Sequence, residues 1–308
     1  MIKYGEVKAT EWDHDNPGNL PWLTAHPDPH PKRRESGELP TSARRIRTFI
    51  LDIGSFQGGI NWSATKSFVV HLAEGVRGDP KSLTEFTTLK AKGLLASGTA
   101  VIHGAAFGER EFQKMGAAGA RLIWSPRSNL VLYAQTTDIP LAGQKGMRAR
   151  SRLAWTGIQA AAITSLTSCG RLLRSTKRTS TEPSLTPEWI TMITVNAAKA
   201  LALDAFIGRL APELKADITV LRARDDDPTK SVMKTHLQDV QMVWVGGDLL
   251  YANKAILDKM KPGECEAMLV YGSQKKVCVK NTPKAAQTLE DIRAMLHKNY
   301  PLLAPLTP

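Results

Sequence analysis

The chain has 308 residues, which is enough for one large domain or two smaller ones. An apolar share of 42% and a charged share of 23% are those of a globular protein and exclude a disordered or fibrous chain. The net charge of +12 raises the question of an anionic partner. No run of about 18 apolar residues occurs, so we expect no membrane partner.

Much of the charge lies in one stretch, residues 148–181. It contains seven Lys or Arg, eleven Ser or Thr, and no Asp or Glu. Without those seven positive charges the net charge falls from +12 to +5. No aromatic-interleaved basic motif accompanies the stretch, so we expect no nucleic-acid partner. A basic nucleic-acid-binding protein stays open as a second alternative.

The cysteines and the first residues bear on the cellular compartment. Cys169, Cys265 and Cys278 form no CxxC pair and no even framework, which is typical of a reducing compartment. The first 19 residues lack the basic-then-apolar pattern of a signal peptide. We therefore expect a cytoplasmic protein.

The elements expected in chain order begin after an irregular segment, residues 1–46, which shows neither helical nor strand periodicity. Four apolar runs then alternate with helix-like segments, and this alternation predicts parallel βα units. The runs are 47–54, 67–75, 98–107 and 120–129, and the helix-like segments are 79–96 and 108–119. In such units the chemistry collects at the carboxyl ends of the strands.

The second half of the chain shows a different pattern. Residues 185–203 are typical of a helix, and 206–223 of a turn and a strand. Residues 240–252 predict a hairpin with Gly246–Gly247 at its turn. The remaining residues are mixed and Lys-rich, with one amphipathic helix at 288–300.

Polar residues follow two consecutive apolar runs. His71 ends one predicted strand, and Glu74 follows it in the loop. A neutral imidazole there binds a metal ion, and a carboxylate over the metal-bound water shuttles its proton. His103 ends the next strand, within reach of the same water. The HxxE spacing alone also fits a plain core or surface histidine, whereas two histidines at consecutive strand ends favour a site.

Four segments together resemble the amidohydrolase superfamily, most closely its cytosine deaminase and chlorohydrolase-like branch. They are FVVHLAEG, AVIHGAAF, LIWSPRSNLVLYAQTTDIPLA and TVNAAKALALDAFIGRLAPELKADITVL. The resemblance implies a distorted TIM barrel with one divalent metal ion, zinc or iron, and a small β-sandwich. It also implies that metal-activated water hydrolyses a non-peptide carbon–nitrogen bond in a small molecule.

The resemblance assigns roles to individual residues. His71 matches a metal ligand on the fifth barrel strand, and Glu74 matches the proton shuttle. His103 matches the sixth-strand histidine that orients the hydroxide. Ser128 and Asn129 fall in a seventh-strand region that frames the substrate, although capping of a barrel strand explains these two equally well.

The chain departs from the family pattern in two places. It contains no HxH, so the metal-binding pair of the first strand is absent, and the match begins midway through the barrel. No Asp or Glu lies between Asp138 and Glu182, where the eighth-strand Asp is expected. We therefore expect an N-terminally truncated hydrolase with impaired activity. A catalytically inactive fragment is the alternative.

The expected fold class is α/β, a partial TIM-like (β/α) barrel with a small C-terminal β-sandwich portion. Its expected parts are an irregular segment at 1–46, a partial barrel at 47–205, the β-sandwich portion at 206–252 and a tail at 253–308. The stretch 148–181 is anomalous within the barrel and is expected as loop or irregular helix. Homodimer formation stays open.

The missing Asp reappears when residues 148–181 are read in a shifted frame. The last base of the Trp155 codon and the first two bases of the Thr156 codon together form GAC, which encodes Asp. We predict that resequencing the locus will show a frameshift across about 148–181, with this Asp in the corrected frame. An intact base count without the Asp would contradict this prediction and leave a genuine Ser/Thr/Arg-rich insertion.

Overall fold

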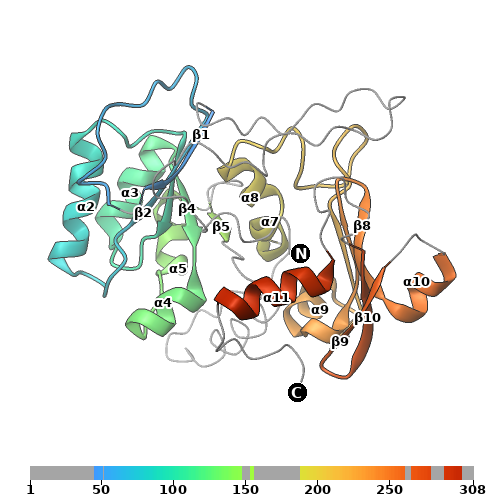
Figure 1. Ribbon diagram of the computed structural model, residues 1–308. Helices are drawn as coiled ribbons and strands as arrows, with labels where there is room; N and C mark the ends of the chain where they lie inside the picture. Colours follow the sequence, from blue (N-terminus) through green and yellow to red (C-terminus); the bar gives the residue numbers. More distant parts are fainter. Residues whose placement is uncertain are drawn as a thin grey trace. The chain divides into compact units, whose positions relative to one another are not determined.

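The computed structural model describes residues 45–50, 52–147, 153–155, 188–260, 265–278 and 288–299 (Figure 1). These residues divide into two compact units, with the change between Leu214 and Lys215. We call them the N-terminal unit and the C-terminal unit. The boundary expected from the sequence lies nine residues earlier, after residue 205.

The N-terminal unit contains a parallel sheet, in which Figure 1 labels β1, β2, β4 and β5. The strands lie in the order β1-β2-β3-β4-β5. The strands are β1 Ile46–Ile50, β2 Ser67–Leu72, β3 Thr99–His103, β4 Arg121–Trp124 and β5 Leu153–Trp155. Spatial neighbours are also neighbours in the chain, which confirms the predicted parallel βα units. The described strands form an open sheet, and their carboxyl ends share one edge.

Helices follow the strands of this unit. They are α2 Pro80–Ala91, α3 Glu109–Ala118, α4 Pro126–Tyr133, α5 Ile139–Ala142, α7 Glu188–Ile193 and α8 Val195–Ala200, with a π-helical turn at Gly143–Met147. Asp79 caps α2 by accepting a hydrogen bond from the Ser82 amide, and Pro80 occupies the first turn. The helix expected over 185–203 is interrupted at Thr194, whose backbone is not helical.

Both faces of the parallel sheet are buried, which explains its near-continuous apolar strands. Alternate residues of β2, namely Phe68, Val70 and Leu72, join a cluster with side chains of α2 and α3. Val69 belongs to a second cluster that includes Ala200 of α8. The sheet therefore has helices packed on each face.

Strand β5 lies inside the anomalous stretch 148–181. It pairs with β4 in parallel, with Leu122 opposite Leu153 and Trp124 opposite Trp155. The expectation of loop or irregular helix is therefore wrong for 153–155, and the rest of the stretch lies outside the described residues. Its last described residue, Trp155, lies beside the codon junction that encodes Asp in the shifted frame.

The C-terminal unit contains an antiparallel sheet, in which Figure 1 labels β8, β9 and β10. The strand order is β6-β7-β8-β10-β9. Its elements are β6 Ile218–Leu221, α9 Pro228–Lys234, a 3₁₀ turn at Leu237–Asp239, β7 Val240–Val245, β8 Asp248–Asn253, α10 Lys254–Met260, β9 Glu266–Val270, β10 Ser273–Val277 and α11 Leu289–Asn299. The predicted hairpin is confirmed, because Gly246 and Gly247 both have positive φ at its two-residue turn.

The antiparallel sheet extends beyond residue 252, where only a mixed tail is expected from the sequence. Strands β9 and β10 pair with each other, and β10 pairs with β8, so both belong to the sheet. The amphipathic helix expected at 288–300 is present as α11. Among the described helices of the chain, none is both long and apolar enough to cross a membrane.

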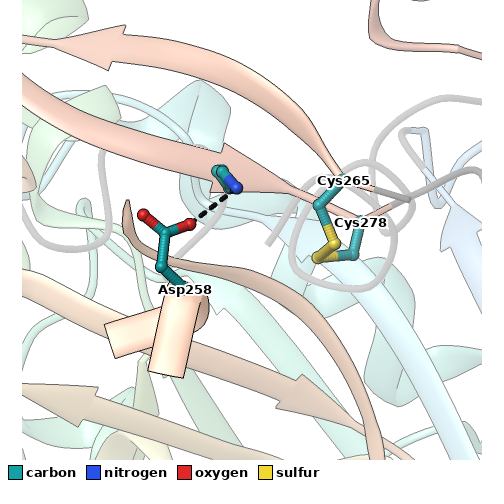
Figure 2. Close-up of a disulfide and its surroundings, with 4 residues drawn as sticks. Asp258, Cys265 and Cys278 are labelled. Carbon is teal, nitrogen blue, oxygen red and sulfur yellow. Dashed lines mark hydrogen bonds and ion pairs between the residues drawn. A yellow bond between two sulfur atoms is a disulfide. The ribbon is translucent and has the colours of Figure 1, made fainter. Parts of the chain in front are cut away.

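A disulfide joins Cys265 to Cys278 across the β9–β10 hairpin (Figure 2). Glu266 pairs with Val277 in the sheet register, so the residues just outside this pair lie opposite each other. The expectation that the cysteines form no framework is wrong, because strand pairing joins positions that are 13 apart in sequence. Disulfides are rare in a reducing cytosol. This crosslink therefore counts against the reducing compartment that the cysteine pattern indicates.

Removing the disulfide tests its contribution to the C-terminal unit. We expect the double substitution Cys265→Ala and Cys278→Ala to lower the free energy of unfolding by about 3 kcal/mol, because the crosslink closes a short loop in the unfolded chain. Urea unfolding measures the loss of stability, and hydrogen exchange of the β9 and β10 amides shows whether the loss lies in this hairpin. Cys169→Ala is the control for removing a cysteine outside the crosslink. Equal unfolding midpoints for the two variants would contradict the prediction.

Candidate functional site

Two histidines lie side by side at the carboxyl edge of the parallel sheet. His71 is the fifth residue of β2, and His103 is the last residue of β3. The adjacent strands place His71 opposite Ile102 and Leu72 opposite His103. The two imidazole rings have centroids 5.4 Å apart. The structure thus brings together the two histidines singled out in the sequence.

Both ring nitrogens of His103 face polar side chains. Nδ1 lies 2.7 Å from Oδ1 of Asn129, and Nε2 lies 3.3 Å from Oε1 of Glu74. The other end of the Asn129 amide donates to Oγ1 of Thr137 at 3.2 Å, and that hydroxyl donates to the carbonyl oxygen of His103 at 2.6 Å. These bonds fix the amide orientation, so Oδ1 accepts and Nδ1 of His103 carries a proton.

The proton on Nδ1 determines which form of Nε2 faces the Glu74 carboxyl group. A neutral ring then presents the lone pair of Nε2 to the Glu74 carboxyl group, and two bare acceptors at 3.3 Å repel each other. The charge of Glu74 therefore favours a proton on Nε2 of His103. Burial lowers the pKa of His103, while the charge of Glu74 and the hydrogen bond with Asn129 act to raise it.

The Glu74 side of this pair is open to solvent. His103 is 5% exposed, whereas the side chain of Glu74 is 33% exposed. A carboxyl group that has an imidazole behind it and solvent in front of it can accept and return a proton. The arrangement is therefore suited to general acid–base catalysis at the sheet edge.

The backbone at both strand ends is in the left-handed region. Ala73 has φ +52° and His103 has φ +72°, which is uncommon for residues other than glycine and costs of order 1–3 kcal/mol each. Two hydrogen bonds join the strained ends, from Gly104 N to Leu72 O at 3.0 Å and from Ala106 N to Ala73 O at 3.0 Å. Strain of this kind concentrates at functional sites.

Two carboxylates and a phenol share this edge. Oε2 of Glu85, on α2, accepts a hydrogen bond from the Ala73 amide at 2.6 Å. Burial raises the pKa of Glu85, and the nearby charge of Glu74 adds to the effect. Burial also raises the pKa of Tyr133, with further contributions from Glu74 and Glu85. These three side chains are close enough to affect one another electrostatically.

Ser128 and Asn129, the two residues of the seventh-strand region, have different surroundings in the structure. Asn129 is fully buried and contacts His103, whereas Ser128 is half-buried. Within the described part of the chain, no hydrogen bond of the Ser128 side chain is present. Asn129 therefore supports the imidazole, and contact of Ser128 with a substrate stays a prediction.

Sequence reasoning missed Glu85, Thr136 and Thr137. Thr136 accepts a hydrogen bond from the Trp124 indole at 2.7 Å, and Thr137 joins Asn129 to the carbonyl of His103. No spacing rule connects these positions, because each contact depends on how a helix or loop packs against the strand ends. A polar TTD sequence shortly after a helix is a local signal, and it predicts only a loop.

The described residues do not fit a catalytic metal site. No group of three or more His, Cys, Asp or Glu side chains comes together in the described ranges. His71 alone represents the predicted ligand set at this edge, and a catalytic zinc site usually has three protein ligands. Both nitrogens of the neighbouring His103 already face Asn129 and Glu74.

Comparison with known proteins identifies the family. A model of the amidohydrolase family matches residues 58–250, which is more than half of the chain. The chain belongs to the amidohydrolase family. The resemblance found in the sequence is thereby confirmed at the family level. A search of curated protein sequences finds no match.

Several solved structures are similar to this amidohydrolase chain. Guanine deaminase of E. coli has 19% identity and a TM-score of 0.50, over 61% of this chain and 48% of that one, which shows a shared fold. A zinc-bound adenosine deaminase of Xanthomonas campestris has 18% identity and a TM-score of 0.49, over 59% and 45%. Zinc-complexed atrazine chlorohydrolase of Arthrobacter aurescens has 18% identity and a TM-score of 0.49, over 60% and 44%. The chain spans about half the length of these structures.

Substituting Asn129 tests the buried network of this amidohydrolase chain. We expect Asn129→Ala to lower the free energy of unfolding by about 1–3 kcal/mol, because it leaves the buried Nδ1 of His103 without an acceptor and removes the hydrogen bond to Thr137. Ser128→Ala, at the preceding position, is the matched control and should change stability by less than about 0.5 kcal/mol. Urea unfolding measures both variants, and equal losses would contradict the network.

Proposed function

We propose that this chain derives from a metal-dependent hydrolase that cleaves non-peptide carbon–nitrogen bonds in small molecules, of the amidohydrolase or deaminase type. We further propose that the chain retains the proton-transfer residues of that site and is impaired as an enzyme. The observation that carries the proposal is the contact of Glu74 with the buried imidazole of His103, which also contacts Asn129. This contact occurs in a chain of the amidohydrolase family.

The proton-transfer role follows from the atoms involved. Oε1 of Glu74 takes a proton from the attacking water and returns it to the leaving nitrogen. Nε2 of His103 faces this oxygen and holds the hydroxide in line, while Nδ1 stays protonated against Asn129. General acid–base catalysis requires a fixed proton acceptor, and the 3.3 Å contact with His103 supplies a fixed position for Oε1 of Glu74.

The open parallel sheet fits part of a larger barrel. We propose that β1 to β5 correspond to strands four to eight of the (β/α) barrel, and that the antiparallel sheet corresponds to the small β-sandwich. Strand β5 then occupies the place of the eighth strand and ends where the family has its metal-binding Asp. A divalent ion, zinc or iron, would supply Lewis-acid activation of water in the complete site.

A cytoplasmic location and a homodimer stay predictions.

The residues of this chain favour impaired activity. His71 is the remaining member of the predicted ligand set, because the sequence contains no HxH and no Asp at the eighth-strand position. One imidazole holds a divalent ion far more weakly than three ligands do. The alternative is a catalytically inactive amidohydrolase chain. The lack of a group of three or more metal-binding side chains among the described residues is also consistent with it.

Metal content and turnover test the proposal. We expect the purified full chain to contain well below one equivalent of zinc or iron by elemental analysis. We expect ammonia release from guanine, adenosine and cytosine to be weak. Near-equimolar metal with rapid turnover would contradict the impaired state.

A matched pair of variants tests the role of Glu74. Any hydrolysis that remains should fall about 100-fold or more in Glu74→Gln, because the amide cannot accept the proton from water. The control is Glu109→Gln on α3, which alters a carboxylate that pairs with Lys145 and not with His103. Equal residual rates in the two variants would contradict proton transfer by Glu74.

A further inference from the structure

We propose that helix α2 positions the Glu74 carboxyl group, with Glu85 as a positioning residue that fixes the loop from which Glu74 projects. The inference rests on the proposed function of Glu74 in proton transfer. It assigns a role to Glu85, which lies eleven positions from Glu74 and has no place in the HxxE motif.

The first contact lies immediately before Glu74. The Ala73 amide donates to Oε2 of Glu85 at 2.6 Å, and Ala73 is the residue in the left-handed conformation. An amide at the end of a strand loses its ladder partner, and a carboxylate acceptor replaces it with a charge-assisted bond. Glu85 therefore stabilises the backbone turn that redirects the chain after β2.

The second contact lies immediately after Glu74. Gly75 packs so closely on α2 that an added Cβ would lie 2.2 Å from Oγ of Ser82. Ser82 is itself held by Asp79, to which its amide and hydroxyl donate at 2.8 and 2.6 Å. Glu74 is thus flanked on both sides by residues that contact the same helix.

Helix α2 is a rigid support for these contacts. Asp79 caps it, and Phe86 and Leu89 anchor it in the main core of the N-terminal unit. Glu85 lies next to Phe86, so its carboxyl group extends from a backbone that packing holds in place. A site supported by a packed helix keeps its geometry better than one on a free loop.

The geometry that results is the contact between Glu74 and His103. Oε1 of Glu74 lies 3.3 Å from Nε2 of His103, while Ala106 N donates to Ala73 O at 3.0 Å. The β2 loop is thus held to α2 through the Ala73 amide and to the β3 loop through the Ala73 carbonyl. Loss of Glu85 releases the first of these two bonds and lets Glu74 leave His103.

The experiment compares three substitutions at position 85 in the full chain. Glu85→Gln keeps an oxygen that accepts the Ala73 amide, whereas Glu85→Asp is one methylene too short and Glu85→Ala has no acceptor. The first measurement is the nuclear Overhauser contact between Hε1 of His103 and the side-chain protons of Glu74. The second is hydrogen exchange of the Ala73 amide.

We expect Glu85→Gln to keep the Overhauser contact and Glu85→Asp and Glu85→Ala to lose it. Exchange at Ala73 should rise about tenfold to hundredfold in the last two variants, as loss of one buried hydrogen bond implies. The matched control is Glu111→Ala, which removes another carboxylate that binds a loop amide, that of Gly108 at 3.1 Å. The control should leave the contact intact.

Two outcomes would overturn the proposal. One is an unchanged Overhauser contact in Glu85→Asp, and the other is its loss in Glu85→Gln. The comparison of Asp with Gln stands by itself if Glu85→Ala does not fold. Metal content and turnover do not enter these measurements, so the positioning role and the proposed function can fail separately.

Discussion

His103 is 5% exposed at the end of β3, and the site depends on how its ring nitrogens are satisfied. A buried imidazole needs a polar group at each nitrogen, since an unmet one costs about 1–3 kcal/mol. Oδ1 of Asn129, on α4, is hydrogen-bonded to Nδ1, and Oε1 of Glu74, in the loop after β2, faces Nε2. One buried ring therefore draws three consecutive βα units together at a single edge of the sheet.

The polar edge also explains where backbone strain is tolerated. Left-handed residues follow β2 and precede Gly104, and each lies in a dense set of hydrogen bonds. Thr137 binds the carbonyl of His103, and Glu85 binds the amide of Ala73. These bonds offset the strain and place the His103–Glu74 pair at the carboxyl edge of an otherwise apolar sheet.

The C-terminal unit is held by different means. The Cys265–Cys278 crosslink closes its edge hairpin, and α10 and α11 contribute Leu257 and Leu289 to separate apolar clusters. Lys275 is buried, and its ammonium group donates to carbonyl oxygens of Gln238 and Val240 at 2.8 and 2.7 Å. The covalent bond thus closes one hairpin, and the buried Lys275 joins β10 to residues 37 and 35 positions earlier in the chain.

Local patterns in the sequence determined the parallel βα units, the Gly246–Gly247 hairpin and the pair of histidines at consecutive strand ends. Apolar runs of strand length and paired glycines act through neighbouring residues, so they can be read directly. Only the tertiary structure decided that Glu85 binds Ala73, that Thr137 orients Asn129, that β5 forms at 153–155 and that Cys265 meets Cys278. These contacts depend on strand register and helix docking, which bring distant positions together and leave no periodic signal in the chain.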